Sequence, residues 1–222
     1  MRSCLQVTAT APNTPQAKGY ARSVATADVP IGNTYDKYAS KNPIERRLMD
    51  GFFAALDAAL PATAVSILEV GVGEAEVAGR VRARYPQARF VGIDLPDPDL
   101  AAHWVAQGLA GTFADIAQLP FADASFDLVL AIEVLEHVPD PAAAVRELRR
   151  LATGSLVLSV PREPIWRVAN LARGKYVGAL GNTPGHVNHW SRRRFAELVG
   201  SQLAVRSVTT PFPWTMVAAS AR

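Results

Sequence analysis

Hydrophobic positions along the chain change their spacing repeatedly, and these changes predict alternating strands and helices. Between the strands, apolar residues recur every three or four positions, as in the helical series Val77, Val81 and Tyr85. Strands that alternate with helices predict an α/β fold whose parallel sheet is covered by helices on both faces. The strand-like segments, which are short and apolar, are 65–70, 89–94, 111–116, 126–132 and 155–160.

Helix boundaries are indicated by the residues that cap them. Residues 42–45, Asn-Pro-Ile-Glu, place Asn as N-cap and Pro in the first helical position, so a helix is expected to begin there. Pro141 opens a further helix, which Gly154 is expected to end. Ser191 is expected to cap a short helix that continues to Gly200.

The two ends of the chain differ in character. Residues 1–28 are rich in Ala, Thr, Ser and Pro and lack apolar periodicity, so a mobile tail is expected. Residues 29–222 are expected to form one domain. Its last two apolar segments, 203–209 and 214–220, are expected to form an antiparallel pair of strands at an edge of the sheet.

The strand at 65–70 runs directly into two glycines, Gly71 and Gly73, and then into a helix. Glycine allows a sharp backbone turn and the close approach of a ligand, so this corner is a candidate nucleotide-binding site. The dinucleotide fingerprint G-x-G-x-x-G would need a third glycine where the chain has Glu76. Glu74 and Glu76 also place negative charge where a pyrophosphate would bind, which disfavours an NAD-dependent oxidoreductase and favours a cationic ligand. A plain strand-to-helix turn is the alternative.

Further segments complete a pattern. The stretch Leu68-Glu69-Val70-Gly71-Val72-Gly73 precedes Asp94, then Asp115 and Leu119-Pro120-Phe121, and finally Phe126-Asp127-Leu128-Val129. This order resembles the class I S-adenosylmethionine (SAM)-dependent methyltransferases, especially the type 11-like group that methylates small molecules. The resemblance covers about residues 35–160, with Ala75 in place of the last glycine of the family's first motif. It implies SAM as cofactor and a Rossmann-like, seven-stranded, mostly parallel sheet with an antiparallel last strand.

Cofactor-binding residues follow from position and from the resemblance. Asp94 ends a strand about 20 residues beyond the glycine corner, where a carboxylate can accept hydrogen bonds from ribose hydroxyls; a turn-forming role is the alternative. The resemblance implies that Asp115 binds the adenine amino group, that the backbone of Ile116 contacts the ring, and that Glu133 lies beside the methionine end. It also implies a lid within 29–60, although simple packing explains its tyrosines too. The predicted set is Tyr35, Glu69, Gly71, Gly73, Asp94, Leu95, Asp115, Ile116 and Glu133.

The segment 161–190 follows the fifth strand, where the resemblance implies an acceptor pocket. From 162 to 194 the chain has seven basic residues and one acid, whereas its total charge is +3. Arginine pairs well with carboxylate and phosphate, and aromatic rings can stack on a ring or line an apolar chain. We therefore expect an anionic acceptor with an apolar or aromatic part, methylated on oxygen; a solvated basic surface is the alternative. The predicted acceptor-binding residues are Arg162, Trp166, Arg167, Arg173, Tyr176 and Trp190.

Three histidines are candidate general bases: His186, His189 and His137. The third has a structural role or packs against the cofactor in many relatives, as the resemblance implies. The spacing His186-x-x-His189 also invites a metal interpretation. Pro184 and Gly185 indicate a loop there, and neither a cysteine nor a third ligand lies nearby in the sequence, so no metal site is expected.

Composition excludes several function classes. The 222 residues are 49% hydrophobic and 19% charged, which is typical of a globular protein with a sizeable core. The net charge of +3 is too small to argue for nucleic acid, and the single cysteine, Cys4, excludes an intrachain disulfide. Without an apolar run long enough to span a membrane, or the apolar core of a signal peptide, the chain is expected in the cytoplasm. Its expected partner is a small-molecule acceptor, and its oligomeric state is open.

Other methyl-transfer chemistries fit less well. Adenine and cytosine N-methylases usually carry an [Asp/Asn]-Pro-Pro-aromatic motif after the fourth strand, where this chain has Glu133-Val134. Carbon-5 pyrimidine methylases need a catalytic cysteine, and Cys4 lies in the predicted tail. A non-catalytic SAM-binding or scaffold protein on the same fold is the rival from another class.

Overall fold

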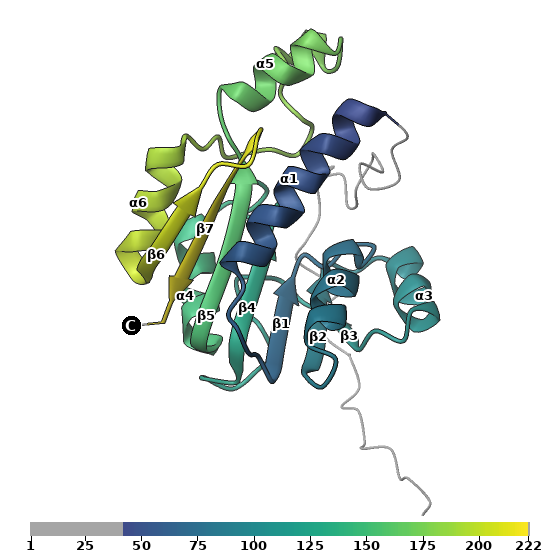
Figure 1. The fold of residues 1–222 in the computed structure, drawn as a ribbon, viewed down its shortest axis with the longest axis vertical. Coiled ribbons are helices and arrows are strands. Elements are labelled where there is room, and N and C mark those ends of the chain that lie inside the picture. Colours follow the sequence, from purple (N-terminus) through teal and green to yellow (C-terminus); the bar gives the residue numbers. More distant parts are fainter. Residues whose placement is uncertain (1–41, 222) are drawn as a thin grey trace, which may run out of the picture.

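The computed structural model describes residues 42–221. Seven strands form one sheet in the order β3-β2-β1-β4-β5-β7-β6 (Figure 1). In chain order the elements are α1 (Pro43–Ala59), β1 (Ser66–Val70), α2 (Glu76–Arg84), β2 (Arg89–Asp94), α3 (Pro98–Ala106), β3 (Gly111–Phe113), β4 (Phe126–Ile132), α4 (Pro141–Leu151), β5 (Ala152–Pro161), α5 (Ile165–Ala172), a 3-10 helix (Val177–Ala179), α6 (Arg192–Gln202), β6 (Ala204–Thr209) and β7 (Trp214–Ser220).

The sheet is of the predicted Rossmann-like type. The first five strands pair in parallel, β7 is antiparallel to β5, and β6 is antiparallel to β7. The final strand of the chain therefore lies inside the sheet, and β6 forms the edge. The strand order reverses between β1 and β4, and ligands of such sheets bind outside the carboxyl ends of the strands near that point.

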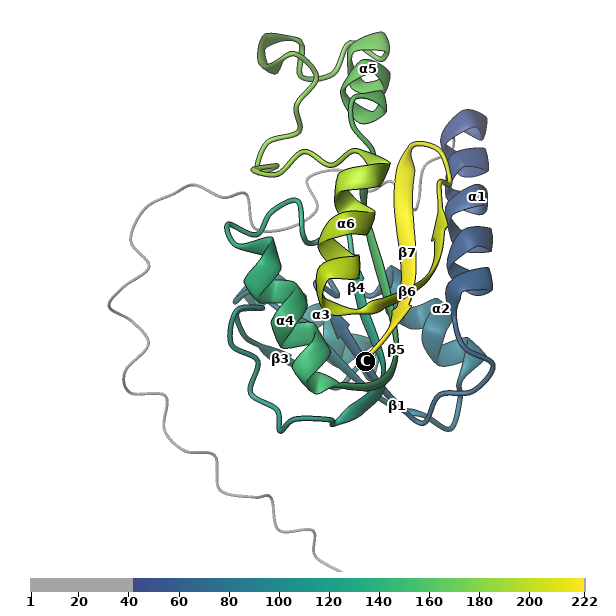
Figure 2. The ribbon, with the colours of Figure 1, turned by 90° about the vertical axis from the view of Figure 1, so that its left-hand side faces the viewer.

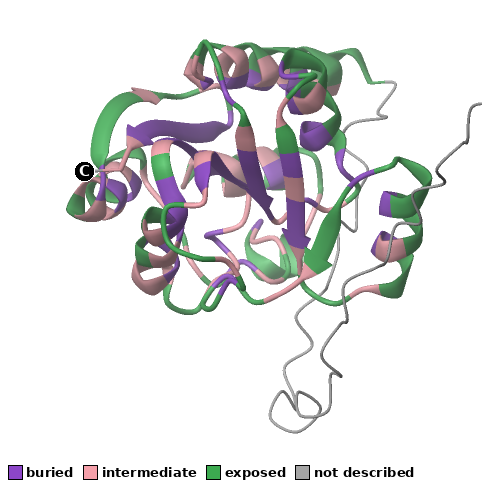
Figure 3. Cartoon of the chain, turned by 90° about the horizontal axis from the view of Figure 1, so that it is seen from below, coloured by how far each residue is buried: buried purple, intermediate pink, exposed green. Residues whose placement is uncertain are grey.

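Helices cover both faces because strand side chains alternate between them. On β1, Ile67 packs with residues of α1, α2 and α3, whereas Leu68 packs with residues of α4 and α6. Figure 2 shows α4 and α1 on opposite sides of the strands, with α5 beyond the carboxyl ends. The middle strands are buried along most of their length, and β3 is largely exposed (Figure 3).

The predicted caps at Asn42 and Ser191 are confirmed. The side chain of Asn42 accepts a hydrogen bond from the Ile44 N–H, and that of Ser191 accepts one from the Arg194 N–H. Two helices, α3 and α5, are not among the predicted elements. Asp97 caps α3 ahead of a proline, which is the same signal that marks α1, but here it follows a turn-rich stretch.

Two predicted boundaries differ from the structure. Helix α4 ends at Leu151 and β5 already begins at Ala152, so Gly154 lies within the strand instead of ending the helix. A Cβ atom on Gly154 would lie 2.5 Å from the carbonyl oxygen of Asp127, so its glycine permits close approach to the chain of β4. The third strand ends at Phe113, earlier than expected.

Two predictions fall on residues outside the described range. These are the mobile tail of 1–28 and the lid that contains Tyr35. Within residues 42–221, no helix is both long and apolar enough to cross a lipid bilayer.

Candidate functional site

The glycine corner is a tight turn that leaves space beside it. Gly71 and Gly73 have φ values of +75° and +48°, which glycine adopts without strain. The N–H groups of Gly71 and Val72 both donate to the carbonyl oxygen of Ile93, which ties the corner to the end of β2. A Cβ atom on Gly71 would lie 2.3 Å from a methyl carbon of Val134, whereas one on Gly73 would meet no atom within 4 Å. Gly73 thus offers backbone that a ligand can approach.

Helix α3 supports this corner, although the sequence did not predict it. The indole N–H of Trp104 donates to the carbonyl oxygen of Gly73 at 2.8 Å, and His103 Nε2 lies 2.9 Å from that of Glu74. Trp104 is 4% exposed. The cap at Asp97 was the signal that could have revealed α3 and hence this support.

Two carboxylates stand beside the corner at the ends of β1 and β2. Asp94 accepts hydrogen bonds from the N–H groups of Gly73 and Leu95, both at 2.7 Å. Burial raises the pKa of Asp94, and these two hydrogen bonds partly oppose that rise. Glu69 is 2% exposed, and its pKa is raised well above the ordinary value by burial first and by the Asp94 charge second. Among the described residues, Glu69 Oε2 has no hydrogen-bond partner.

The remaining predicted cofactor residues lie at the same carboxyl edge of the sheet. Asp115 is exposed in the loop after β3, where its side chain accepts from the Ala117 N–H at 2.9 Å, and Ile116 is 7% exposed. Glu133 follows β4 with a positive φ of 60°. Its two carboxylate oxygens accept hydrogen bonds from Ser159 Oγ at 3.1 Å and from the Trp214 indole N–H at 2.7 Å.

A cavity of about 760 Å³ adjoins Glu133, which forms part of its wall. The wall comes from the start of α1, the loop after β4, the segment 164–186 and the turn before β7. Its side chains are largely apolar or aromatic, among them Ile44, Leu48, Met49, Ile165, Trp166, Tyr176, Phe212 and Trp214.

The structure separates the predicted acceptor-binding residues into two groups. Trp166, Arg173 and Tyr176 line the cavity. Of these, Arg173 donates to Asn170 Oδ1 at 2.7 Å and forms an ion pair with Glu45 at 3.5 Å.

The other three lie outside the wall. Arg162 forms an isolated bridge with Trp190 and donates its N–H to the carbonyl oxygen of Pro213. Trp190 packs against Phe195 on the α6 side of the sheet. Arg167 donates from Nε to a carbonyl oxygen of the loop, that of Leu180.

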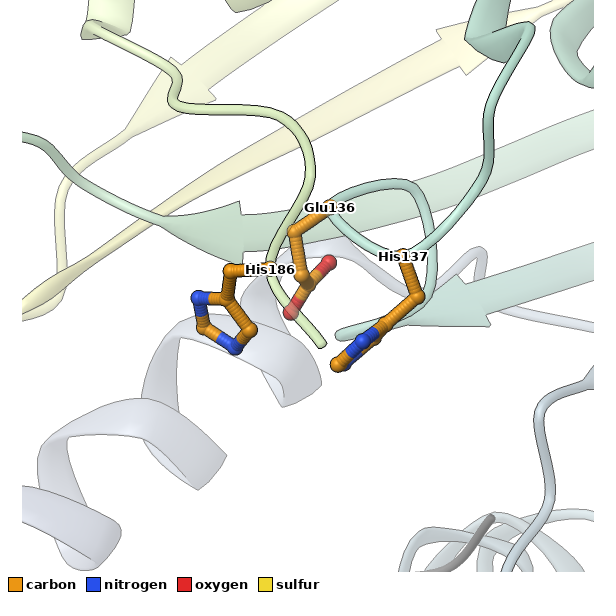
Figure 4. Close-up of side chains that lie close together, drawn as sticks. All are labelled: Glu136, His137 and His186. Atoms are coloured by element: carbon orange, nitrogen blue, oxygen red, sulfur yellow. The ribbon is translucent and has the colours of Figure 1, made fainter. Parts of the chain in front are cut away.

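Two of the three predicted histidines meet at the cavity. His137 and His186 both line it, with ring centroids 4.9 Å apart. Glu136 joins them, and Figure 4 shows its carboxylate close to both imidazoles. His189 is exposed, lies outside the wall, and donates from Nε2 to Asn182 Oδ1 at 2.8 Å. Sequence spacing did not identify Glu136, because its partner His186 lies 50 residues further along the chain.

Comparisons with known proteins bear on this arrangement. A family profile described as a methyltransferase domain matches residues 68–157. An uncharacterized methyltransferase of Mycobacterium tuberculosis is 30% identical over 139 residues, which cover 55% of this chain and 71% of that protein. The chain belongs to the class I SAM-dependent methyltransferases.

Further similarities lie within the same family. A ubiquinone biosynthesis O-methyltransferase of Pseudomonas paraeruginosa is 30% identical over 146 residues, which are 57% of this chain and 62% of that relative. The match thus spans less than two thirds of its length. The structure of a magnesium protoporphyrin IX methyltransferase from Synechocystis with bound S-adenosylhomocysteine has a TM-score of 0.60 at 15% identity, over 82% of this chain and 89% of that one. At that identity the likeness concerns the fold.

The residues at the sheet edge fit SAM, the cofactor of this family. The ligand carries a sulfonium and an ammonium group, which suit the negative environment of Glu69 and Asp94. Two further observations support SAM. Glu69 Oε2 can still accept a hydrogen bond, and the space beside the Cα atom of Gly73 is open to a ligand. A buried carboxylate at this position, that of Glu69, would not favour a pyrophosphate.

Proposed function

We propose that this protein transfers the methyl group of SAM to a small-molecule acceptor, at an oxygen atom of a partly aromatic or anionic metabolite. The observation that carries the proposal is the continuity of the two sites through Glu133. This residue follows β4, whose Ala131 pairs with Val70 just before the glycine corner, and its side chain lines the cavity. A methyl group presented at the sheet edge would therefore face the cavity.

The cavity wall supports an acceptor with an apolar or aromatic body. Trp166, Tyr176 and Trp214 offer ring surfaces, and only Arg173 and Lys175 among the basic residues of 162–194 belong to the wall. An anionic group of the acceptor would find these two cations in the wall. The relative from Pseudomonas paraeruginosa is named as an O-methyltransferase, which supports oxygen as the acceptor atom.

Few residues need to take part in the chemistry. SAM supplies a methyl group that is already activated for displacement, so positioning can provide much of the rate acceleration. Glu133 is held by hydrogen bonds from β5 and β7, so this part of the wall is rigid. A hydroxyl acceptor must also lose its proton, and His137 and His186 are the histidines at the wall. A cavity that adjoins the cofactor edge favours an enzyme over a non-catalytic SAM-binding protein.

Calorimetric titration tests the cofactor assignment. We expect SAM and S-adenosylhomocysteine to bind at one site and NAD not to bind. Asp94→Ala should weaken SAM binding by about 1–3 kcal/mol, because ribose hydroxyls and the Gly73 N–H lose their acceptor. Asp99→Ala, an exposed acid of α3, is the matched control and should leave the affinity unchanged. Equal SAM affinity in the two variants would refute the role of Asp94.

Methyl transfer itself is tested with isotopically labelled SAM and fractionated pools of small metabolites. The proposal expects label in a compound that carries a hydroxyl group and an apolar or aromatic body. If the protein binds SAM and no pool accepts label, the non-catalytic alternative holds.

A further inference from the structure

Glu136, His137 and His186 form a cluster that methyl transfer from SAM does not by itself require. Their carboxylate oxygen and imidazole nitrogen ligand atoms all lie within 4.8 Å of one another (Figure 4). Glu136 is 1% exposed and His186 is 9% exposed, whereas His137 is half-buried and gives the cluster contact with solvent. All three residues also line the cavity.

We propose that this cluster binds one divalent transition-metal ion, which in turn holds the acceptor oxygen. The second part of this inference rests on the function proposed above, whereas the first part does not. Two imidazole nitrogens and one carboxylate oxygen form a ligand set of catalytic zinc sites, in which a fourth position stays open. Here the open position would face the cavity.

The hydrogen bond of His137 prepares its ring for this role. Its Nδ1 lies 3.0 Å from the carbonyl oxygen of Gly185, and because a carbonyl only accepts, Nδ1 carries the proton. When the ring is neutral, its lone pair is then on Nε2. Histidines that bind metals usually donate their other N–H to a carbonyl or carboxylate in this way.

The two loops that supply the ligands are joined by a network of hydrogen bonds. The carbonyl oxygen of Glu136 accepts from the N–H groups of Val187 and Asn188, at 2.9 and 3.0 Å. The side chain of Asn188 donates to the carbonyl oxygens of Leu135 and Val138, at 3.1 and 2.6 Å. These bonds fix the backbone on both sides of the cluster, so only side chains need to move when an ion binds.

The ring of His186 is held from the other side by Trp166. The two rings stack at 6.2 Å with an interplanar angle of 27°, and the Trp166 indole N–H donates to Thr183 Oγ1 at 2.9 Å. An ion with bonds of about 2.1 Å places tetrahedral ligand atoms roughly 3.4 Å apart. Ligand atoms that lie up to 4.8 Å apart would therefore approach one another by up to about 1.4 Å around the ion, which small side-chain rotations can provide.

The ligand types select the metal. Magnesium and calcium prefer oxygen ligands alone, whereas imidazole suits zinc, iron, nickel and copper. Zinc has no redox chemistry, and methyl transfer involves none, so Zn²⁺ is the expected ion and Co²⁺ is its spectroscopic substitute.

The ion would activate the acceptor as a Lewis acid. On binding to it, the acceptor hydroxyl loses its proton to solvent. An oxygen lone pair then forms the new bond to the methyl carbon, the carbon–sulfur bond breaks with its electron pair going to sulfur, and S-adenosylhomocysteine leaves. No oxidant or reductant is needed.

Metal binding is tested on the full chain by equilibrium dialysis against Zn²⁺, with Co²⁺ absorption as a measure of coordination. We expect one high-affinity ion per chain and at least a 100-fold loss of affinity in His137→Ala and in His186→Ala. His189→Ala is the matched control and should bind the ion like the wild type. Unchanged SAM affinity in each variant shows that the fold is intact, which matters because the backbone near His186 joins the two loops. If the wild type binds Zn²⁺ no more tightly than the two cluster variants, the site does not exist.

The role of the ion is tested once an acceptor is identified. Treatment with a chelator should lower kcat/KM at least 100-fold without changing SAM affinity, and Zn²⁺ or Co²⁺ should restore it. Methyl transfer that resists chelation would overturn this role and would leave His137 or His186 as a general base. Failure to find any acceptor would contradict the proposed function, while the Zn²⁺ titration would still decide the metal site.

Discussion

At the scale of single residues, Glu69 is an acid in an environment that is unfavourable without a ligand. It is almost fully buried, it lies near the charge of Asp94, and burial raises its pKa well above 4.5. A raised pKa means that the folded chain either carries a buried charge at neutral pH or binds a proton, and both cost stability. A cationic ligand would offset this cost, so the carboxylate is suited to binding more than to folding.

The substitution Glu69→Gln separates the effect of this carboxylate on folding stability from its effect on cofactor binding. The variant should be more stable than the wild type at neutral pH, because the folded state no longer disfavours a charge. The cost to the wild type grows as the pH rises from 4.5 through the raised pKa, so the difference should vanish below pH 4.5. SAM affinity should fall about tenfold, because a charge-assisted hydrogen bond is lost. Denaturant unfolding between pH 4 and 8 measures the stability, and titration with SAM measures the affinity. A variant that is less stable than the wild type at pH 7 would contradict the argument.

The residues at the cofactor edge could be predicted because each follows directly from its own strand. Asp94 can be recognised from its position at the end of β2 and from its sequence distance to the glycine corner. The cluster at Glu136 could not be predicted in this way, because hydrogen bonds of Asn188 bring His186 to it from a remote loop. A histidine pair at i and i+3 suggested His189 as the partner of His186, but the fold turns His189 toward Asn182.

At the scale of elements, the corner between β1 and α2 requires glycine at position 71, whereas α2 does not require it at position 79. Gly71→Ala should destabilise the protein by roughly 2 kcal/mol or more, because φ is +75° and the new Cβ atom would meet Val134 at 2.3 Å. Gly79→Ala is the matched control within α2, where φ is ordinary and an added Cβ atom would meet no neighbouring residue within 4 Å. It should stabilise the protein by roughly 0.5–1 kcal/mol.

Thermal or denaturant unfolding distinguishes the two substitutions. The corner variant should also bind SAM more weakly, whereas the α2 variant should bind it normally. Equal stability of Gly71→Ala and the wild type would show that the corner can relax, and would weaken its assignment as a rigid cofactor cradle.

Elements with local signals were predictable, and those that depend on tertiary contacts were not. Helix α1 has a cap, a proline and a regular apolar face, and all three are visible in the sequence. Helix α5 has no side-chain cap, and its buried Asn170 donates to the carbonyl oxygen of Gly181 in the following loop. That interaction exists only after the loop has folded back, so apolar spacing alone does not reveal it.

At the scale of the whole molecule, the cavity is assembled from parts that are far apart in the chain. Asn42, Ile44 and Glu45 at the start of α1 share its wall with residues that follow β5 and with the turn before β7. Glu45 and Arg173 pair across this wall. The basic residues of 162–194 formed one group in the sequence, but only Arg173 and Lys175 of this group line the cavity. Arg167 donates to the carbonyl oxygen of Leu180 instead, and the three arginines at 192–194 are exposed on α6.

The entry of the chain into α1 leads to a prediction about the residues before it. Asn42, the first described residue, lines the cavity. The sequence predicts that residues 33–40, within the expected lid, close over the cofactor. Deletion of residues 1–28 should leave SAM affinity and methyl transfer unchanged. Deletion of residues 1–40 should weaken SAM binding or lower kcat by about tenfold, since closure excludes water and holds the substrate in place. Unfolding midpoints of the two truncated chains control for damage to α1, and equal activity at equal stability would show that no such lid operates.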